Sequence, residues 1–218
     1  MGIGQGGGRM NWADMTLREF QAALASSSPT PGGGTASAVA LGQAASLSIM
    51  VCDLTLGNEK WKEGWVVAEE IQKIAIPGMS RSNALATEDS QAFDRVMDSF
   101  GLPKTTDEEK SVRRDAIREA TLEAAVVPFE TASLAMNLLS SLPELAAKGN
   151  GNAVTDVGVA GLLASAAAKG AIFNVEINLD SLPEEMGVTI REELPRLKEQ
   201  TRIASRAVMD AVRERMGQ

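Results

Sequence analysis

Apolar residues recur at helical intervals from the first ordered-looking part of the chain. Leu17, Phe20 and Leu24 lie three or four residues apart, as they would on one face of a helix. Thr16 followed by Glu19 has the spacing of a capping box, in which each residue satisfies a free backbone N–H of the other. We therefore predict a helix that begins after Thr16 and ends before the Ser26–Pro29 stretch.

The same reasoning predicts helices along most of the chain. The expected segments are 35–56, 58–75, 80–100, 107 past 122 and on to 141, 143–148, 155–168 and 189–216. Pro77 is expected to end the third helix, and Pro128 to kink or restart the long one, because proline removes a helical hydrogen bond. The pattern predicts an all-α, single-domain bundle of long helices around a central helix, 35–56, that is rich in small residues.

One segment has a different pattern. Phe173, Val175, Ile177 and Leu179 alternate with polar residues, which is typical of a strand. A single strand would have no partner elsewhere in this sequence to satisfy its backbone groups. The local pattern leaves helix and strand open, and the pattern of the whole chain favours a helix over 173–179.

Composition removes several kinds of chemistry. The 218 residues contain no histidine and no tyrosine, so a Ser-His-Asp triad is excluded and the commonest metal ligand is absent. The net charge of −8 disfavours nucleic acid and anionic membranes as partners. The single cysteine, Cys52, lies among apolar residues, and we expect it to be buried rather than a reactive thiol. A chain without disulfides fits a cytoplasmic location.

The N-terminus and one apolar stretch differ in composition from the rest of the chain. Residues 1–14 begin with a glycine-rich run and are expected to be a flexible leader, with the helical domain covering 15–218. Residues 35–52 carry no charge but include several Ser, Thr, Gly and Gln residues. We interpret this stretch as a buried, small-residue helix and not as a membrane span.

Two features are candidates for chemistry. Gly32, Gly33 and Gly34 precede the small-residue helix, where free backbone amides can bind an anion or a developing oxyanion; a tight turn for close packing is the alternative. Asp89 is spaced to lie on the apolar side of its helix, where lost hydration would raise its pKa and make it an acid or base near neutral pH. An ion pair or a position at the solvent edge would instead make Asp89 structural.

Other polar residues allow two interpretations each. Asn174 and Asn178 share a face in a helix or a strand, and could hold a heterocycle or cap neighbouring helices. Asp156 is expected to be an N-cap. Asp53 is expected to face solvent near a helix end.

The order of several motifs resembles the formiminotransferase-cyclodeaminase C-terminal domain family. The matching segments are Pro29-Thr-Pro-Gly-Gly-Gly-Thr35, Met50-Val51 with Leu54-Thr55, Gly57 through Lys60-Trp61, Asp89-Ser-Gln-Ala-Phe93, Leu102-Pro-Lys104 with Glu108-Glu-Lys110, Val127-Pro128, Gly149-Asn-Gly-Asn152, Thr155-Asp156 and Asn174-Val-Glu-Ile-Asn178-Leu179. The resemblance covers residues 15–215. After Gly57 this chain has Asn58-Glu59, where many family members look more basic.

The resemblance implies an all-helical, usually dimeric enzyme of folate one-carbon metabolism. Such an enzyme opens or closes the N5,N10-methenyl ring of tetrahydrofolate, as a methenyltetrahydrofolate cyclohydrolase or a formiminotetrahydrofolate cyclodeaminase. By position, Asp89 would be the general acid and base. The residues that would line or support the folate site are Gly32, Gly33, Gly34, Lys60, Asn150, Asn152, Asp156, Asn174 and Asn178, with Lys60 meeting the glutamyl carboxylates of a substrate that can be polyglutamylated.

Partners and cofactors follow from the same resemblance. No metal or cofactor is expected, the folate being the substrate. A homodimer is expected, acting alone or beside a separate formiminotransferase. A helical folate-binding or scaffold protein without catalysis is the alternative, and Asp89 separates the two, because a scaffold has no need of a carboxylate on an apolar stripe.

Overall fold

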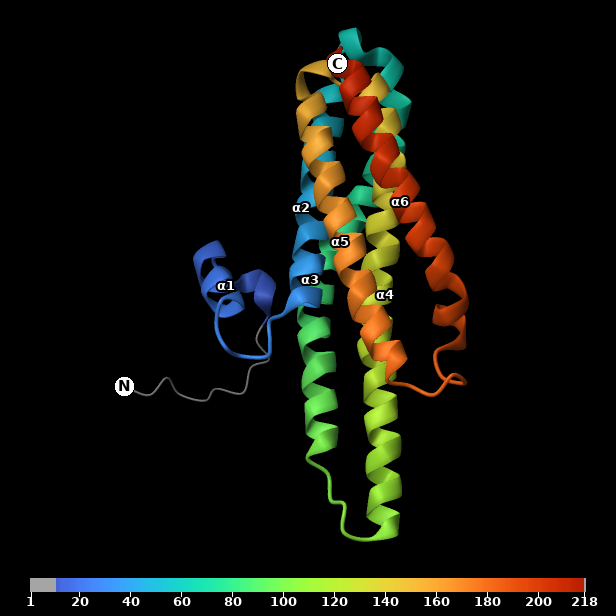
Figure 1. The fold of residues 1–218 in the computed structure, drawn as a ribbon. Coiled ribbons are helices and arrows are strands. Elements are labelled where there is room, and N and C mark those ends of the chain that lie inside the picture. Colours follow the sequence, from blue (N-terminus) through green and yellow to red (C-terminus); the bar gives the residue numbers. More distant parts are fainter. Residues whose placement is uncertain (1–10, 218) are drawn as a thin grey trace, which may run out of the picture.

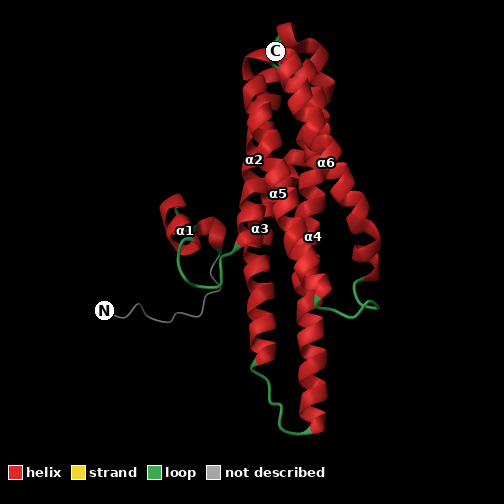
Figure 2. Ribbon diagram, in the orientation of Figure 1, coloured by secondary structure: helices red, strands yellow, loops and turns green. Residues whose placement is uncertain are grey.

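The chain folds into a bundle of long helices, and no strand occurs among residues 11–217, which the computed structural model describes (Figures 1 and 2). The long helices are α2, α3, α4, α5 and α6, and the short elements are η1, α1, η2 and η3. Their bounds are η1 Trp12–Asp14, α1 Leu17–Leu24, α2 Gly33–Thr55, η2 Glu59–Gly64, α3 Trp65–Phe100, α4 Asp107–Lys148, η3 Gly151–Ala153, α5 Val154–Asp180 and α6 Val188–Met216. The predicted all-α, single-domain fold is confirmed.

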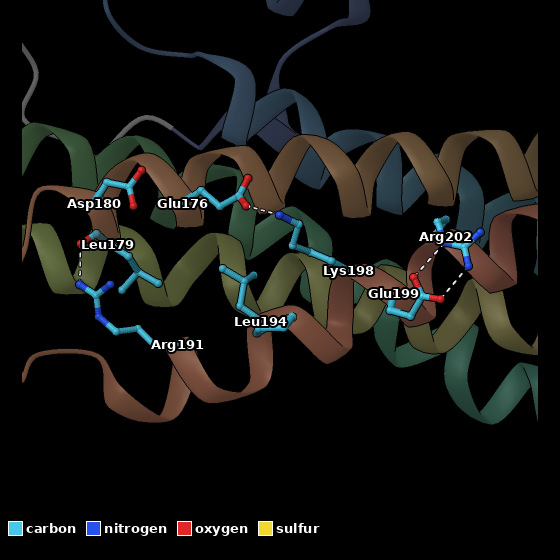
Figure 3. Close-up of a pocket in the computed structure, with 9 residues that line it drawn as sticks. Glu176, Leu179, Asp180, Arg191, Leu194, Lys198, Glu199 and Arg202 are labelled. Carbon is cyan, nitrogen blue, oxygen red and sulfur yellow. Dashed lines mark hydrogen bonds and ion pairs between the residues drawn. The ribbon is translucent and has the colours of Figure 1, made fainter. Parts of the chain in front are cut away.

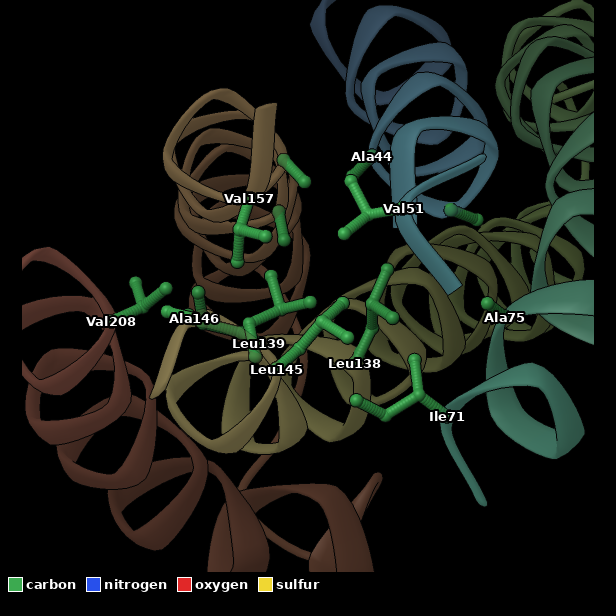
Figure 4. Packing of buried hydrophobic residues seen from close by; sticks show 14 of the residues in the cluster. Ala44, Val51, Ile71, Ala75, Leu138, Leu139, Leu145, Ala146, Val157 and Val208 are labelled. Carbon is green, nitrogen blue, oxygen red and sulfur yellow. The ribbon is translucent and has the colours of Figure 1, made fainter. Parts of the chain in front are cut away.

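Helix α4 packs against all four other long helices, while α2 packs between α3 and α5 and also touches α4. The core between them joins alanines of α2 and α5 to leucines of α4 (Figure 4). Small side chains let the helix backbones approach closely, and the larger Leu138, Leu139 and Val157 fill the remaining space. Helices α2 and α5 therefore run side by side along one side of the bundle.

The predicted end of a helix at Pro77 and the predicted break before Pro143 are wrong, and no new helix starts at Pro128. Pro77 lies inside the continuous helix α3, and Pro128 and Pro143 lie inside the continuous helix α4. Each proline removes a backbone hydrogen bond, but buried turns on both sides of it pack into the core, as Ala75 and Leu85 do around Pro77. Tertiary packing outweighs the local cost. The expected helix over 58–75 is also replaced, by η2 followed by α3.

Two predictions about local structure are confirmed. Thr16 and Thr106 begin α1 and α4 with complete capping boxes, in which Glu19 and Glu109 return the hydrogen bonds. Residues 173–179 belong to α5. The alternation there arises because Val175 and Leu179 face the core while Phe173 and Ile177 are exposed.

The described part of the expected leader is ordered. Trp12 begins η1, and its indole Nε1 donates a hydrogen bond to Ser90 of α3 at 2.9 Å. An indole needs a partner for its N–H and a surface for its ring. Ser90 of α3 accepts from the N–H, and Phe20 of α1 packs against the ring, with 6.4 Å between the ring centroids. The leader prediction for residues 1–10 lies outside the described residues.

Three described helical segments have the length and hydropathy of a membrane span: Gly33–Thr55, Asp107–Lys148 and Gly151–Asp180. About half of each apolar window is buried inside the bundle. For α2 this agrees with the predicted small-residue helix that packs in the core. Cys52 on α2 is fully buried, as expected, and burial, followed by the nearby Asp53 charge, raises the pKa of its thiol to about 12. Asp53 itself is exposed.

Candidate active site

The amino end of α2 is built from the triple glycine. Gly32 occupies the N-cap position in an extended conformation, and no side chain of its own caps the helix. The first backbone hydrogen bond runs from Ala36 N to Gly32 O, so the amides of residues 33–35 point away from the helix interior. A negatively charged group placed here is stabilised by these amides and by the helix dipole.

Asp89 of α3 supplies that negative group. The hydroxyl of Thr35 donates to Asp89 Oδ2 at 3.0 Å. Burial raises the pKa of Asp89 above its ordinary value, while hydrogen bonds from the hydroxyl and the backbone N–H of Thr35 act in the opposite direction. No cation among residues 11–217 contributes to that balance. An ion pair was the alternative that would make Asp89 purely structural. No such pair forms with the described residues.

A chain of hydrogen bonds fixes the carboxylate. Trp12 Nε1 donates to Ser90 Oγ at 2.9 Å, and Ser90 and Thr35 are joined at 3.0 Å. Because the Thr35 hydroxyl donates to Asp89, Ser90 donates to Thr35, and the four groups form one directed series. Ser90 and Thr35 are buried, so water does not compete for these bonds.

Gly34 leaves room for this arrangement. A Cβ atom at position 34 would lie 2.6 Å from Cγ and 2.7 Å from Oδ2 of Asp89, which is closer than real atoms pack. The close approach at Gly34 fits the alternative of a turn that permits close packing, and anion binding by the glycine amides stays a prediction. At Gly33 the nearest atom to an added Cβ would be Asn174 Nδ2 at 3.9 Å.

The two asparagines of α5 lie at the same end of α2. Asn174 Nδ2 donates to Gly170 O at 2.9 Å, and Asn178 Nδ2 donates to Ala124 O of α4 at 2.8 Å. Both side chains are partly exposed. We call Gly32–Gly34, Asp89, Asn174 and Asn178 the glycine end of α2.

The remaining predicted residues lie at the opposite end of α2. Asn150 Nδ2 donates to Leu54 O at 2.9 Å, and its side-chain oxygen accepts from Asn152 N at 3.0 Å. Lys60 is exposed, with Nζ 4.6 Å from the centre of the Trp61 ring. We call Lys60, Asn150, Asn152 and the nearby Asp156 the lysine end of α2.

Asp156 does not cap α5. The N-cap is Ala153, which makes no side-chain cap bond, and Asp156 lies in the first turn. The N-cap prediction is wrong because η3 places the N-cap at Ala153, three residues before Asp156. The helix dipole still stabilises a negative charge in the first turn.

Within one chain, the predicted site residues do not form a single cluster. Gly34 and Leu54 are twenty residues apart in the continuous helix α2, a distance of about 30 Å at 1.5 Å per residue. The sequence motifs gave no signal of this division, because order along the chain does not say which end of a helix a loop meets.

The lysine end also contains residues that the sequence did not single out as site residues. Arg215, in the last turn of α6, lies over the Trp61 ring, with its Cζ atom 5.5 Å from the ring centre. A groove of about 430 Å³ beside them is lined by Lys60, Lys62, Lys148 and Arg215 together with Glu59 and Glu63. The surplus of cations suits anionic groups. At the glycine end, the sequence missed Thr35 as the partner of Asp89 and Ser90 as the partner of Thr35. Their place inside the two motifs was the available signal.

A groove of about 620 Å³ between α5 and α6 holds none of the predicted site residues (Figure 3). Its charged side chains neutralise one another, as Lys198 pairs with Glu176 and Arg202 with Glu199. Arg191 donates to the carbonyls of Leu179, Leu182 and Met186 and so closes the α5–α6 turn. These contacts hold α5 and α6 together, so the groove needs no functional explanation.

The glycine end lies in an all-helical bundle and combines a partly buried carboxylate with amides at a helix N-terminus, the kinds of groups that acid–base chemistry uses. The sequence model of the formiminotransferase-cyclodeaminase family matches residues 16–194, and the chain belongs to this family. Its own motifs carry that membership, since Gly32–Gly34, Asp89 and Asn174 all lie inside the matched range.

Known relatives agree with this membership. The chain is 38% identical to the methenyltetrahydrofolate cyclohydrolase of Methylorubrum extorquens over 170 residues, which cover 78% of this chain and 81% of that protein. It is 32% identical to the formimidoyltransferase-cyclodeaminase of Gallus gallus, of which it covers 37%. The crystal structure of formiminotetrahydrofolate cyclodeaminase from Thermotoga maritima superposes with a TM-score of 0.77 at 27% identity, covering 93% of this chain and 96% of that one.

Proposed function

We propose that this protein is a folate one-carbon enzyme that opens or closes the N5,N10-methenyl ring of tetrahydrofolate. The proposal rests on one observation above all: a partly buried carboxylate, Asp89, held at a helix N-terminus without a cationic partner. The named relatives act as a methenyltetrahydrofolate cyclohydrolase and as cyclodeaminases. The cyclohydrolase reaction is favoured, because the relative of that name is 38% identical and of similar length.

Asp89 would move the protons in either reaction. In ring opening, its carboxylate takes a proton from the water that attacks the bridging carbon and returns it to the nitrogen that leaves. In ring closure, it takes the N10 proton and gives it to the departing ammonia. A raised pKa suits both steps, since the same group must accept and then donate near neutral pH.

The rest of the glycine end would hold the pterin and the tetrahedral intermediate. The amides of Gly33 and Gly34 would offer hydrogen bonds to developing negative charge. Within residues 11–217, no side chain or backbone group donates to the Oδ1 atoms of Asn174 and Asn178. These two oxygens can accept hydrogen bonds from a pterin ring.

The wider expectations remain part of this proposal. Lys60 would meet the glutamyl carboxylates of the substrate, since it stands among exposed cations. The enzyme would work in the cytoplasm as a homodimer, without a resident cofactor, and beside a separate formiminotransferase if formimino substrate is used.

The test follows the absorbance of methenyltetrahydrofolate with purified protein. One cuvette starts from the methenyl compound, and loss of absorbance faster than in buffer supports a cyclohydrolase. A second starts from the formimino compound, and a gain of absorbance with release of ammonia supports a cyclodeaminase. No change in absorbance in either cuvette beyond the buffer rate, with folate binding detected by calorimetry, would instead support the non-catalytic folate-binding protein.

A further inference from the structure

Element η1 is held on α3, next to Asp89. It stands with α1 beside the bundle, near the amino end of α2 (Figure 1). The backbone N–H of Trp12 donates to Thr87 Oγ1 at 3.3 Å, and the Trp12 indole Nε1 donates to Ser90 Oγ at 2.9 Å. Thr87 and Ser90 are three residues apart and so lie on one face of α3. Trp12 is therefore anchored at two points on the helix that carries Asp89.

Packing fixes the indole ring of Trp12 as well. The ring meets Phe20 of α1 with 6.4 Å between the centroids and an angle of 69° between the planes, an edge-to-face arrangement that aromatic pairs favour. Thr87 Oγ1 in turn donates to Asn11 Oδ1 at 3.1 Å, and Asn11 is the residue that caps η1. The packing of the ring and the docking of its backbone thus aim the indole N–H at Ser90.

Ser90 uses its hydroxyl differently from other buried hydroxyl residues of the long helices. The hydroxyls of Ser48, Thr55 and Thr131 each donate to the carbonyl four residues back in their own helix. Ser90 makes no such bond within the described chain, and its oxygen lies 3.0 Å from Thr35 Oγ1 instead. Because an indole N–H can only donate, it binds the Ser90 oxygen and leaves the Ser90 proton for Thr35.

The resulting series of hydrogen bonds points toward Asp89. Trp12 donates to Ser90, Ser90 to Thr35, and Thr35 to Asp89 Oδ2. Each hydroxyl that accepts a hydrogen bond becomes a better donor for the next, because bonded groups polarise one another. Hydrogen bonds to a carboxylate favour its charged form. An N–H group two hydroxyls away can therefore affect both the protonation and the direction of the Asp89 carboxylate.

Charged groups do not take over this task. The elements that pack on α3 are α2, α4, η1 and η2, and η2 lies at the lysine end. Residues 33–52 of α2 carry no charge. The acidic groups of α3, α4 and η1 on this side have partners of their own: Glu88 and Glu130 pair with Arg81, Glu123 pairs with Arg95, and Asp14 accepts from Asn11. No charged group within residues 11–217 contributes to the pKa of Asp89.

We propose that Trp12 is a positioning residue for Asp89, which acts through Ser90 and Thr35 to hold the carboxylate ready to accept a proton. The inference rests on the proposed function for the reaction in which that proton moves. Element η1 precedes residues 16–194, the range that matches the family, so the site receives a part from outside that range. Loss of the indole N–H should weaken proton transfer and leave substrate binding unchanged.

Trp12→Phe tests the proposal, since phenylalanine keeps an aromatic ring beside Phe20 and removes the N–H. The aspartate carboxyl groups are labelled with carbon-13, the Asp89 resonance is assigned from its loss in Asp89→Asn, and its titration is followed by NMR. We expect a higher pKa of Asp89 in Trp12→Phe, because a series of bonds that favours the charged form is weakened. An unchanged titration would overturn the proposal, whether or not the protein turns over folate.

Trp65→Phe is the matched control for this titration. The indole Nε1 of Trp65 donates to Thr55 O at 3.0 Å, at the other end of α2, and Trp12 and Trp65 are both half-buried. The control loses the same kind of hydrogen bond, and its Asp89 should titrate as in the wild type. An equal shift in both variants would mean that any lost indole bond loosens the bundle, which contradicts a specific role for Trp12.

Ser90→Ala and the double variant show whether Trp12 acts through Ser90. Ser90→Ala should raise the pKa of Asp89 at least as much as Trp12→Phe does. Trp12→Phe should then add no further shift in the Ser90→Ala background, because the connection between the two residues is already broken. Additive shifts would indicate that the two substitutions act independently, and would overturn the proposal.

Turnover gives a second readout. Loss of one neutral hydrogen bond weakens an interaction by a factor of about two to ten, so kcat of Trp12→Phe should fall by that factor while KM stays near the wild-type value. The acidic limb of the kcat profile should move to higher pH with Asp89. A rise in KM at unchanged kcat would place Trp12 in substrate binding and contradict the positioning role. Absence of turnover in the wild type would refute the proposed function alone, because the NMR titration still decides the role of Trp12.

Discussion

The two ends of α2 divide the properties of a folate site between them. The glycine end holds a carboxylate whose burial raises its pKa and whose partner is the neutral Thr35, which in turn is bonded to Ser90. The lysine end holds exposed cations around Trp61. A buried carboxylate suits proton transfer, and exposed cations suit the capture of anions. Under the proposed function, proton transfer belongs to the glycine end and anion capture to the lysine end of the same helix.

The largest expected effect at the glycine end comes from Gly34→Ala. The new methyl group would occupy the position of the Asp89 carboxylate, so that carboxylate must move. Displacement of a catalytic group by about 1 Å costs on the order of a hundredfold in rate. Steady-state kinetics should show the loss mainly in kcat.

Gly33→Ala is the matched control for this prediction, because its Cβ would meet only Asn174 Nδ2 at 3.9 Å. Both variants place alanine in the first turn of the same helix. Equal activities for Gly33→Ala and Gly34→Ala would contradict the role given to the space at position 34.

Asp89→Asn should stabilise the protein at neutral pH. Because burial raises the folded-state pKa of Asp89, the folded chain binds the proton more tightly, and the charged form destabilises the fold. The penalty is absent below the unfolded pKa of about 3.9 and complete above the raised folded pKa. Thermal melts should give the variant a higher Tm at pH 7 and no advantage at pH 3; a lower Tm at pH 7 would contradict burial as the cause.

The smallest effect concerns Cys52, which lies on α2 between the two ends. Burial raises the pKa of its thiol to about 12, so almost no reactive thiolate exists at pH 8. Iodoacetamide should label the native protein far more slowly than the urea-unfolded protein, and Cys52→Ala should keep full activity. Rapid labelling with loss of activity would place Cys52 in an accessible site.

The fold could be predicted from the sequence more fully than the site. Helix periodicity and the capping boxes at Thr16 and Thr106 are local signals, and the structure confirms them. Pro77 and Pro128 also gave local signals, but packing on both sides keeps α3 and α4 continuous. Local rules fail where tertiary contacts outweigh them.

The site divides in the same way. Asp89, Gly34 and Asn174 lie at one end of α2, as one candidate site would require, although their roles stay predictions. Asn150 and Lys60 lie at the other end, because the α4–α5 loop returns to Leu54 and Thr55. Their position depends on the length of α2 and on which end of α2 each loop contacts. The order of the motifs in the sequence contains neither piece of information.

The most direct test of the account is turnover by Asp89→Asn, measured as loss of methenyltetrahydrofolate absorbance, with folate affinity measured on the same protein. Asparagine keeps the shape and an oxygen that accepts from Thr35, but it cannot take a proton. We predict a fall in kcat of about a hundredfold or more with affinity nearly unchanged, while Asp94→Asn on the exposed side of α3 keeps wild-type rates. Turnover by Asp89→Asn within about tenfold of wild type would contradict the central claim.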